Sequence, residues 1–170
     1  MEYFNTILQA AVFAAEAHKG QVRKYTGLPY INHPISVASR VEAVRGDSQM
    51  IMAALLHDTL EDTKATASDI KQLFGVVVAS YVIALSDMEQ GNRAERKAQS
   101  RIRLAAAPAE VKTIKLADLL DNTEDITLHD PKFARVYMAE KAALLPALQG
   151  GNELLWKQAE AQIARYHASL

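Results

Sequence analysis

The sequence predicts an all-α fold, with one compact domain of about eight to ten helices over residues 1–170. Three observations support this class. Apolar residues recur at three- and four-residue spacing, helix-capping residues precede several of these segments, and the Asn-Gly and Asp-Gly pairs typical of tight β-hairpins do not occur. With 170 residues, 49% of them hydrophobic, the chain can bury a substantial core without disulfides.

The first half of the chain contains several helical segments. Pro34 suits the first position of a helix after His33, and Thr66 with Asp69 three residues later resembles a capping box. The β-branched stretch 76–78 fits most economically into a buried helix that continues to Leu85. The apolar positions of the two earlier helices are Ile7, Leu8, Ala11, Val12 and Ala15, then Val37, Val41 and Val44.

The second half continues the helical series. Pro108 separates two helices, and Gly150 with Gly151 separates the last helix, which Asn152 can cap. The apolar positions of a further helix between them are Val136, Ala139, Ala143 and Leu144. No internal repeat or low-complexity linker divides the chain.

The composition excludes several classes of protein. The absence of Cys removes zinc-finger, thiolate and iron–sulfur chemistry, and a net charge of −1 gives no general attraction for nucleic acid. The longest apolar run, Val76 to Leu85, is too short to cross a membrane, and the residues after Met1 lack the pattern of a secretory signal. We therefore expect a cytoplasmic protein with no nucleic-acid or membrane partner, and a homo-oligomer stays open.

The strongest polar motif follows the apolar run 50–56. If that helix continues for one turn, His57 and Glu61 lie four residues apart, as do Asp58 and Asp62, so four titratable side chains share adjacent faces. Carboxylates at a helix C-terminus oppose the macrodipole and therefore require a compensating cation. A divalent metal ion is one candidate, and a solvated acidic turn is the alternative.

Two other motifs contain polar residues in restricted places. His33 is held directly before Pro34, which suits either metal ligation or a hydrogen-bonded structural histidine. Asp118 lies in a strongly apolar helical segment and shares a face with Asn122. A buried carboxylate there needs a partner, which is either Lys115 or a metal ion, and the salt bridge is the simpler interpretation.

These motifs together supply two histidines and two aspartates as candidate metal ligands. Such a set of nitrogen and oxygen donors suits Mn²⁺, Fe²⁺ or Zn²⁺ and leaves positions for water and a phosphate oxygen. Glu61 and Asp62 lie one turn beyond the ligands, where they can orient or deprotonate that water. The natural chemistry is metal-dependent phosphohydrolysis.

Two basic clusters are either solvated surface or phosphate clamps beside such a site. They consist of Lys19, Arg23 and Lys24, and of Arg93, Arg96, Lys97, Arg101 and Arg103.

Three segments resemble, in matching order, the hydrolase domain of bifunctional guanosine tetra/pentaphosphate synthetase-hydrolases and the stand-alone small alarmone hydrolases. They are AHKGQVRK with GLPYINHP in 17–34, AALLHDTLEDT at 53–63 and KLAD at 115–118. The resemblance covers about residues 4–155. It implies an all-helical HD-domain fold and a Mn²⁺-dependent enzyme that removes the 3′-diphosphate of the alarmone, yielding GDP or GTP plus pyrophosphate.

The same resemblance implies roles for individual residues. The positions that match the family's metal ligands are His33, His57, Asp58 and Asp118. Glu61 and Asp62 match the acidic pair that orients or activates the attacking water. The positions that match substrate-binding residues are Arg23 and Lys24 near the base, Asn122 near the ribose, and Arg93 and Lys97 facing phosphates.

Three positions depart from the family pattern. Where the family usually carries a basic residue, an aromatic or His, and an Arg, this chain has Leu119, Asp121 and Glu124. Two cations are lost and two acids are added, which keeps a second substrate class open: an HD-family phosphatase acting on NADPH or a nucleoside monophosphate. A nucleotide-sensing module without turnover is a third reading, against which the retained Glu61-Asp62 pair argues.

Overall fold

The computed structural model of the protein describes residues 2–170, with side chains from Thr6 onward. The described residues form nine α-helices, one 3₁₀ helix and an isolated β-bridge, which confirms the predicted all-α class and the number of helices. The chain divides into two compact units, one that ends at Met88 and one that spans Glu89–Leu170. That the two units act as the single predicted domain stays a prediction.

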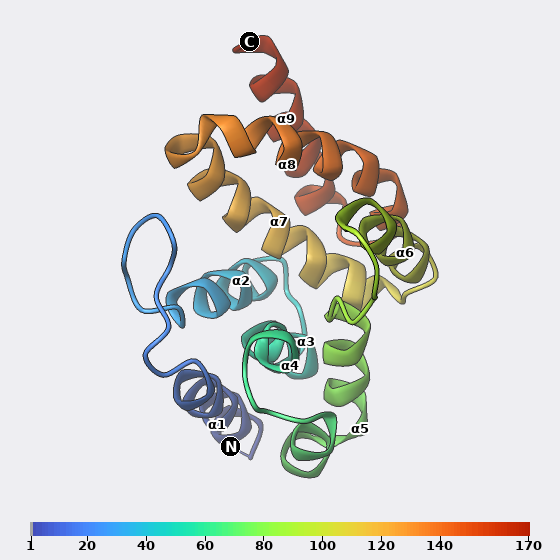
Figure 1. The fold of residues 1–170 in the computed structure, drawn as a ribbon. Helices are drawn as coiled ribbons and strands as arrows, with labels where there is room; N and C mark the ends of the chain where they lie inside the picture. Colours follow the sequence, from blue (N-terminus) through green and yellow to red (C-terminus); the bar gives the residue numbers. More distant parts are fainter. Residues whose placement is uncertain (1) are drawn as a thin grey trace. The chain divides into compact units, whose positions relative to one another are not determined.

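The first unit is built around a central apolar helix. Its elements are α1 (Glu2–Ala17), α2 (Asn32–Ala43), α3 (Ser48–Leu56), α4 (Thr59–Asp62) and α5 (Ala67–Leu85). Residues 52–56 of α3 are all buried, because α1, α2 and α5 pack around this helix (Figure 1). The polar residues His57 and Asp58 follow Leu56 directly, so the central helix delivers them at its C-terminal end.

Local sequence signals determine where these helices begin. The Asp47 carboxylate caps α3 by accepting the backbone N–H of Met50 at 2.8 Å. Thr66 and Asp69 form the predicted capping box at the start of α5. The helix then continues to Leu85 through the β-branched stretch, as predicted, with a break at Gly75, whose φ of +90° favours glycine.

By length and composition alone, α5 could cross a membrane. Its buried residues, which include Ile70, Phe74 and Val82, belong to a helix that packs on α3, and Gly75 interrupts it. A core helix of a globular unit meets the same length and composition test, so this finding adds no support for a membrane span.

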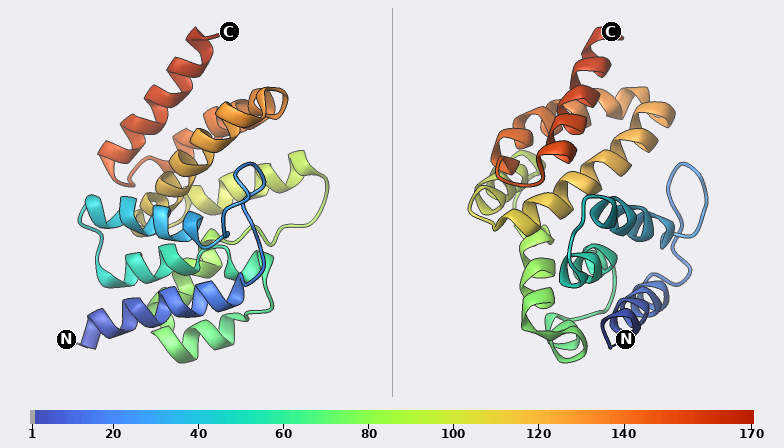
Figure 2. Two further views of the ribbon diagram at one scale, coloured as in Figure 1. Left: turned by 90° about the vertical axis from the view of Figure 1, so that its left-hand side faces the viewer. Right: turned by 180° about the vertical axis from the view of Figure 1, so that it is seen from behind.

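A closed loop joins α1 to α2. The bridge pairs Val22 with Pro29, and Arg23 donates its backbone N–H to the Leu28 carbonyl at 2.8 Å. The loop extends beyond the neighbouring helices in the right-hand view of Figure 2. The following helix begins at Asn32, two residues before Pro34, because turn hydrogen bonds to the carbonyls of residues 29 and 30 already start it.

The second unit is organised around its longest helix, α7. Its elements are α6 (Arg93–Ala105), α7 (Ala109–His129), α8 (Pro131–Leu144), the 3₁₀ helix η1 (Leu145–Leu148) and α9 (Glu153–Ala168). α7 contacts both α8 and α9. Pro108 and Asn152 stand immediately before α7 and α9, as predicted, and the Asn152 side chain accepts two backbone N–H groups of α9.

The buried face of α1 differs from the prediction. Ala10 and Ala14 are completely buried, whereas Leu8 and Val12 are 49% and 65% exposed. The helical period was correct and its phase was wrong. Because α1 packs closely against α3, small side chains occupy the contact and larger ones remain outside.

The predicted face of α8 is wrong for a different reason. Val136 and Ala139 are exposed, whereas Ala134, Met138 and Lys141 are buried. A lysine at a core position is invisible to a hydrophobic pattern, because lysine is almost never fully buried.

Candidate functional site

Three of the predicted metal ligands converge in the first unit. His33 lies in the first turn of α2, and His57 and Asp58 form the turn between α3 and α4. The candidate ligand atoms all lie within 4.8 Å of one another. The Asp58 Oδ2 atom lies 3.1 Å from the Nε2 atom of His57 and 3.5 Å from that of His33, and both imidazoles are buried.

The hydrogen bonding of His57 suits metal ligation. Its Nδ1 atom lies 2.8 Å from the backbone carbonyl oxygen of Ala54. Because a carbonyl can only accept, Nδ1 carries the proton, and the lone pair of Nε2 faces the Asp58 carboxylate. Two acceptors at this distance need a proton or a cation between them, so the donor set fits a divalent metal ion.

Tyr30 contacts the candidate metal ligands, and the sequence alone does not identify it. Its hydroxyl donates to Asp58 Oδ2 at 2.6 Å, and its ring lies edge-on to that of His33 at 5.9 Å between centroids. In the sequence motif before His33, Tyr30 and Ile31 form a bulky apolar pair, which suggests packing for Tyr30. Its place three residues before His33 is the only sequence signal that it reaches the candidate ligands.

A second set of contacts joins the end of α1 to the acidic pair. The His18 ring stacks on the Tyr30 ring at 4.7 Å, and its Nδ1 atom lies 2.8 Å from Gln21 Oε1. The Gln21 amide in turn donates to the backbone carbonyl of Asp62 at 2.7 Å. These contacts hold the Asp62 backbone against α1 and the closed loop.

The i, i+4 pairing in the sequence analysis assumed that α3 continues through the acidic motif. The structure shows that it does not. α3 ends at Leu56 and a separate turn, α4, begins at Thr59. One helical hydrogen bond survives between the ligand and the acidic pair, from the Asp62 N–H to the Asp58 carbonyl at 3.0 Å. The break lets His57 and Asp58 turn toward α2.

The acidic pair has two distinct environments. Glu61 accepts the backbone N–H of Asp87 at 2.7 Å, which orients its carboxylate. Burial raises the pKa of Asp62, and repulsion by the Asp58 carboxylate adds to this, while His18, His57 and a hydrogen bond from Tyr30 act in the opposite direction. A raised pKa makes a carboxylate a stronger base, which suits Asp62 to accept a proton.

Both acids line a pocket of about 770 Å³ in the first unit. Glu16 and Asp69 also line it, and Lys64 is the single basic residue among the described lining residues. An acidic wall of this kind suits water or cations.

Asp118 lies in the second unit, where its carboxylate accepts hydrogen bonds from neighbouring side chains. Its carboxylate is buried, and Lys115 donates to Oδ2 at 2.8 Å, so the salt bridge expected from the sequence forms. Asn122, on the same face of α7, donates to Oδ1 at 2.6 Å. The role of Asp118 as a fourth metal ligand stays a prediction.

The predicted substrate-binding cations occupy three places. Arg23 and Lys24 lie on the closed loop, where the Lys24 ammonium sits over the Tyr25 ring at 4.7 Å. On α6, Arg93 makes a bidentate pair with Glu140 at 2.6 and 2.8 Å, and this pair raises the pKa of Arg93. Lys97 lies one turn further along α6.

Comparison with known proteins assigns the chain to a family. Residues 10–145 match the HD domain family, a range that includes parts of both units. The chain is 40% identical over 130 residues to the guanosine-3′,5′-bis(diphosphate) 3′-pyrophosphohydrolase MESH1 of Danio rerio, covering 74% of this chain and 72% of the relative. It is 38% identical over 160 residues to MESH1 of Homo sapiens, covering 88% of each.

Solved structures show the same fold. A metazoan ortholog of SpoT, described as hydrolysing ppGpp, superposes with a TM-score of 0.88 and 32% identity over 95% of both chains. A protein from Listeria monocytogenes superposes with a TM-score of 0.67 and 22% identity over 77% of this chain and 96% of its own, which supports the fold alone.

Proposed function

Since the chain belongs to the HD domain family and to its MESH1-type hydrolases, we propose that it is a guanosine-3′,5′-bis(diphosphate) 3′-pyrophosphohydrolase. It would cleave the tetra- or pentaphosphate to GDP or GTP plus pyrophosphate. The observation that carries the proposal is the meeting of His33, His57 and Asp58 within 4.8 Å, directly before an acidic pair.

The metal would be held by His33, His57 and Asp58, with Asp118 as the fourth ligand expected from the sequence. We propose Mn²⁺, because nitrogen and oxygen ligands without sulfur suit it, although Fe²⁺ and Zn²⁺ suit the same set. When bound, such an ion lowers the pKa of its water and neutralises charge on the phosphoryl group. The other steps belong to side chains of the protein.

The acidic pair would prepare the water. Glu61, held by the Asp87 N–H, orients the attacking water, and Asp62 accepts its proton on the carboxylate. The water oxygen forms a bond to the 3′-linked phosphorus as the bond from that phosphorus to the 3′-oxygen breaks. Pyrophosphate leaves, and the 3′-oxygen takes up a proton.

Arg23 and Lys24 would meet the base, Asn122 the ribose, and Arg93 and Lys97 the phosphates. The nearly neutral net charge supports a free nucleotide as substrate in preference to nucleic acid.

One observation favours the second substrate class. Arg93 already forms a bidentate pair with Glu140, and Asp121 and Glu124 add negative charge to α7. Fewer available cations suit a ligand with fewer phosphates, such as NADPH or a nucleoside monophosphate.

A product assay tests both candidates. The protein is incubated with Mn²⁺ and either guanosine tetraphosphate, NADPH or a nucleoside monophosphate, and the released phosphate species are identified. Pyrophosphate from guanosine tetraphosphate, lost on chelation, is the expected result. Inorganic phosphate from NADPH or a monophosphate would select the second candidate, and binding of the alarmone without any product would overturn both.

A further inference from the structure

Lys141 is a buried charged residue that the proposed reaction does not use. It lies on α8 with 1% of its surface exposed, and its ammonium donates to Thr123 Oγ1 at 2.8 Å and Gln162 Oε1 at 2.5 Å. Both acceptors are uncharged. Among the side chains that the structure describes, none forms an ion pair with it, and Glu124 and Asp118 attract it only at longer range.

A buried ammonium without a paired anion is unfavourable, because the loss of hydration is not offset by a nearby opposite charge. An anion that approached Lys141 would therefore be bound more strongly than on an ordinary surface.

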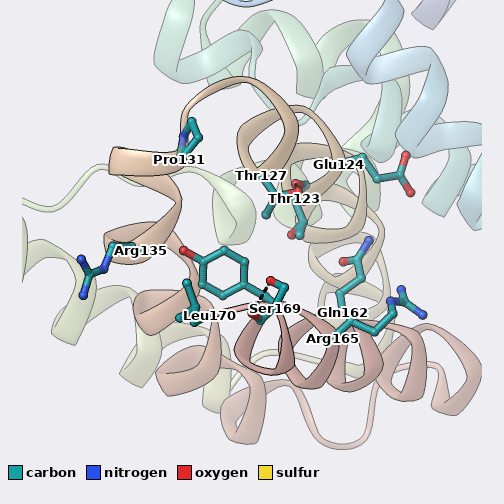
Figure 3. A pocket seen from close by; sticks show the side chains of 10 residues that line it. Thr123, Glu124, Thr127, Pro131, Arg135, Gln162, Arg165, Ser169 and Leu170 are labelled. Carbon is teal, nitrogen blue, oxygen red and sulfur yellow. Dashed lines mark hydrogen bonds between the residues drawn. The ribbon is translucent and has the colours of Figure 1, made fainter.

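The acceptors of Lys141 form part of a pocket wall. Thr123 and Gln162 line a pocket of about 630 Å³ that α7, α8 and α9 enclose within the second unit (Figure 3). The volume is within the range of small-molecule sites. Lys141 is not itself a lining residue, but its ammonium is hydrogen-bonded to these two residues of the wall.

The remaining charges of this pocket are mainly positive. Arg135 of α8 and Arg165 of α9 flank it on opposite sides in Figure 3. Within the described part of the chain, neither arginine forms an ion pair. Glu124 is the one carboxylate side chain among the described lining residues. Arg135 and Arg165 outnumber the one carboxylate side chain of the lining, and Lys141 adds a further positive charge when it is protonated, so the potential of the pocket is positive.

We propose that this pocket binds a small phosphate ester, whose phosphoryl group is attracted by Lys141, Arg135 and Arg165. Guanidinium groups match phosphate oxygens in geometry as well as charge, and Tyr166 also lines the pocket. The pocket lies wholly within Glu89–Leu170 and contains none of the residues assigned to the metal or the acidic pair. It is therefore a second ligand site.

The test uses ribose 5-phosphate as the probe. The full chain is treated with a chelator, so that no metal-bound phosphate contributes, and titrated while the backbone amide resonances of Thr123 and Arg165 are followed. We expect saturable shifts with ribose 5-phosphate, displacement by inorganic phosphate, and no shifts with ribose. Absence of saturation, or equal shifts with ribose, would overturn the proposal.

Two sets of variants locate the binding. Arg135→Gln with Arg165→Gln should weaken binding at least about tenfold, since the double variant removes both guanidinium charges that attract the phosphoryl group. Lys132→Gln removes an exposed cation of α8 outside the pocket and should change the affinity less than about twofold. Equal affinities in the double variant and the control would show non-specific surface binding and exclude the site.

Lys141→Met tests the buried charge separately. It should weaken binding of ribose 5-phosphate while the circular dichroism spectrum stays helical. If this variant fails to fold, the exposed arginine pair decides the question alone, because both side chains lie on the surface.

Discussion

The two units of the chain bury ionisable side chains in opposite ways. In the first unit, His57 Nε2 and Asp58 Oδ2 are acceptors that face each other at 3.1 Å, so the cluster requires a proton or a cation between them. In the second unit, Asp118 has its own cation in Lys115, whereas Lys141 donates only to neutral acceptors and lacks an anion. Burial alone therefore does not identify a ligand site. The sign of the missing partner shows which ligand each site can take.

The largest expected effect removes the carboxylate at the centre of the first cluster. Asp58→Ala should abolish turnover and weaken Mn²⁺ binding more than about 100-fold, because loss of even an outer partner of a metal ligand costs roughly 10- to 100-fold. Calorimetric titration with Mn²⁺ and the pyrophosphate assay measure the two effects. Unchanged affinity for Mn²⁺ would mean that the cluster is not the metal site.

Asp118→Asn tests whether this aspartate of the second unit is the fourth metal ligand. If Asp118 is the fourth ligand, this variant also loses Mn²⁺ affinity, although its size is preserved. If only thermal stability changes, Asp118 serves as the counterion of Lys115 and the four-ligand prediction is wrong.

The next effect separates water activation from metal binding. Glu61→Ala should lower kcat by roughly 10²- to 10⁴-fold, the usual contribution of acid–base assistance, while Mn²⁺ affinity stays close to that of the natural chain. Glu16→Gln is the matched control, because Glu16 lines the same pocket. Full activity in the Glu61 variant would remove it from the mechanism.

Much of the fold could be predicted from local signals. Caps at Thr66 and Asn152 and the helix-separating Pro108 act through neighbouring residues, so the sequence reveals them directly. The buried faces of α1 and α8 could not be found in this way, because the choice of Ala14 over Val12, or of Lys141 over Val136, depends on which neighbour packs there. The local sequence determines the helical period, whereas tertiary packing determines which face of the helix is buried.

In the candidate site, too, local motifs could be predicted from the sequence, whereas a contact between distant residues could not. The motifs predict His33, His57 and Asp58 as metal ligands, and the structure brings their candidate ligand atoms within 4.8 Å of one another. Tyr30 could not be identified, since its contact with Asp58 joins residues 28 positions apart. Oligomeric state and cellular location stay predictions.

A smaller effect is expected from the hydrogen bond between Tyr30 and Asp58 beside the candidate metal ligands. Tyr30→Phe removes the hydroxyl that donates to Asp58 Oδ2 and should weaken Mn²⁺ binding roughly 10- to 100-fold. The ring and its stacking on His18 are retained, so the fold should be unaffected. Tyr166→Phe removes a hydroxyl from the second unit and should leave Mn²⁺ affinity unchanged. Equal affinities in the two variants would show that Tyr30 only packs.

The smallest expected effect is the pH dependence of stability that the buried Lys141 causes. Burial lowers the pKa of Lys141 from 10.5 to about 7; the Arg165 guanidinium contributes, while Glu124 and Asp118 oppose. Between these two values the unfolded chain binds the proton and the folded chain does not, so stability rises with pH. The slope is at most about 1.4 kcal/mol per pH unit.

Lys141→Met should remove this slope. Between about pH 7 and pH 9, the free energy of unfolding of the natural chain should rise on the order of 1–2 kcal/mol relative to the Lys141→Met variant, as measured by urea denaturation. Lys132→Gln, which changes an exposed lysine of the same helix, should follow the natural chain. Parallel curves for all three proteins would mean that Lys141 keeps its proton in the fold. In that case its charge must be balanced by Glu124 or Asp118, and the contrast between a site that lacks a cation and one that lacks an anion would fail.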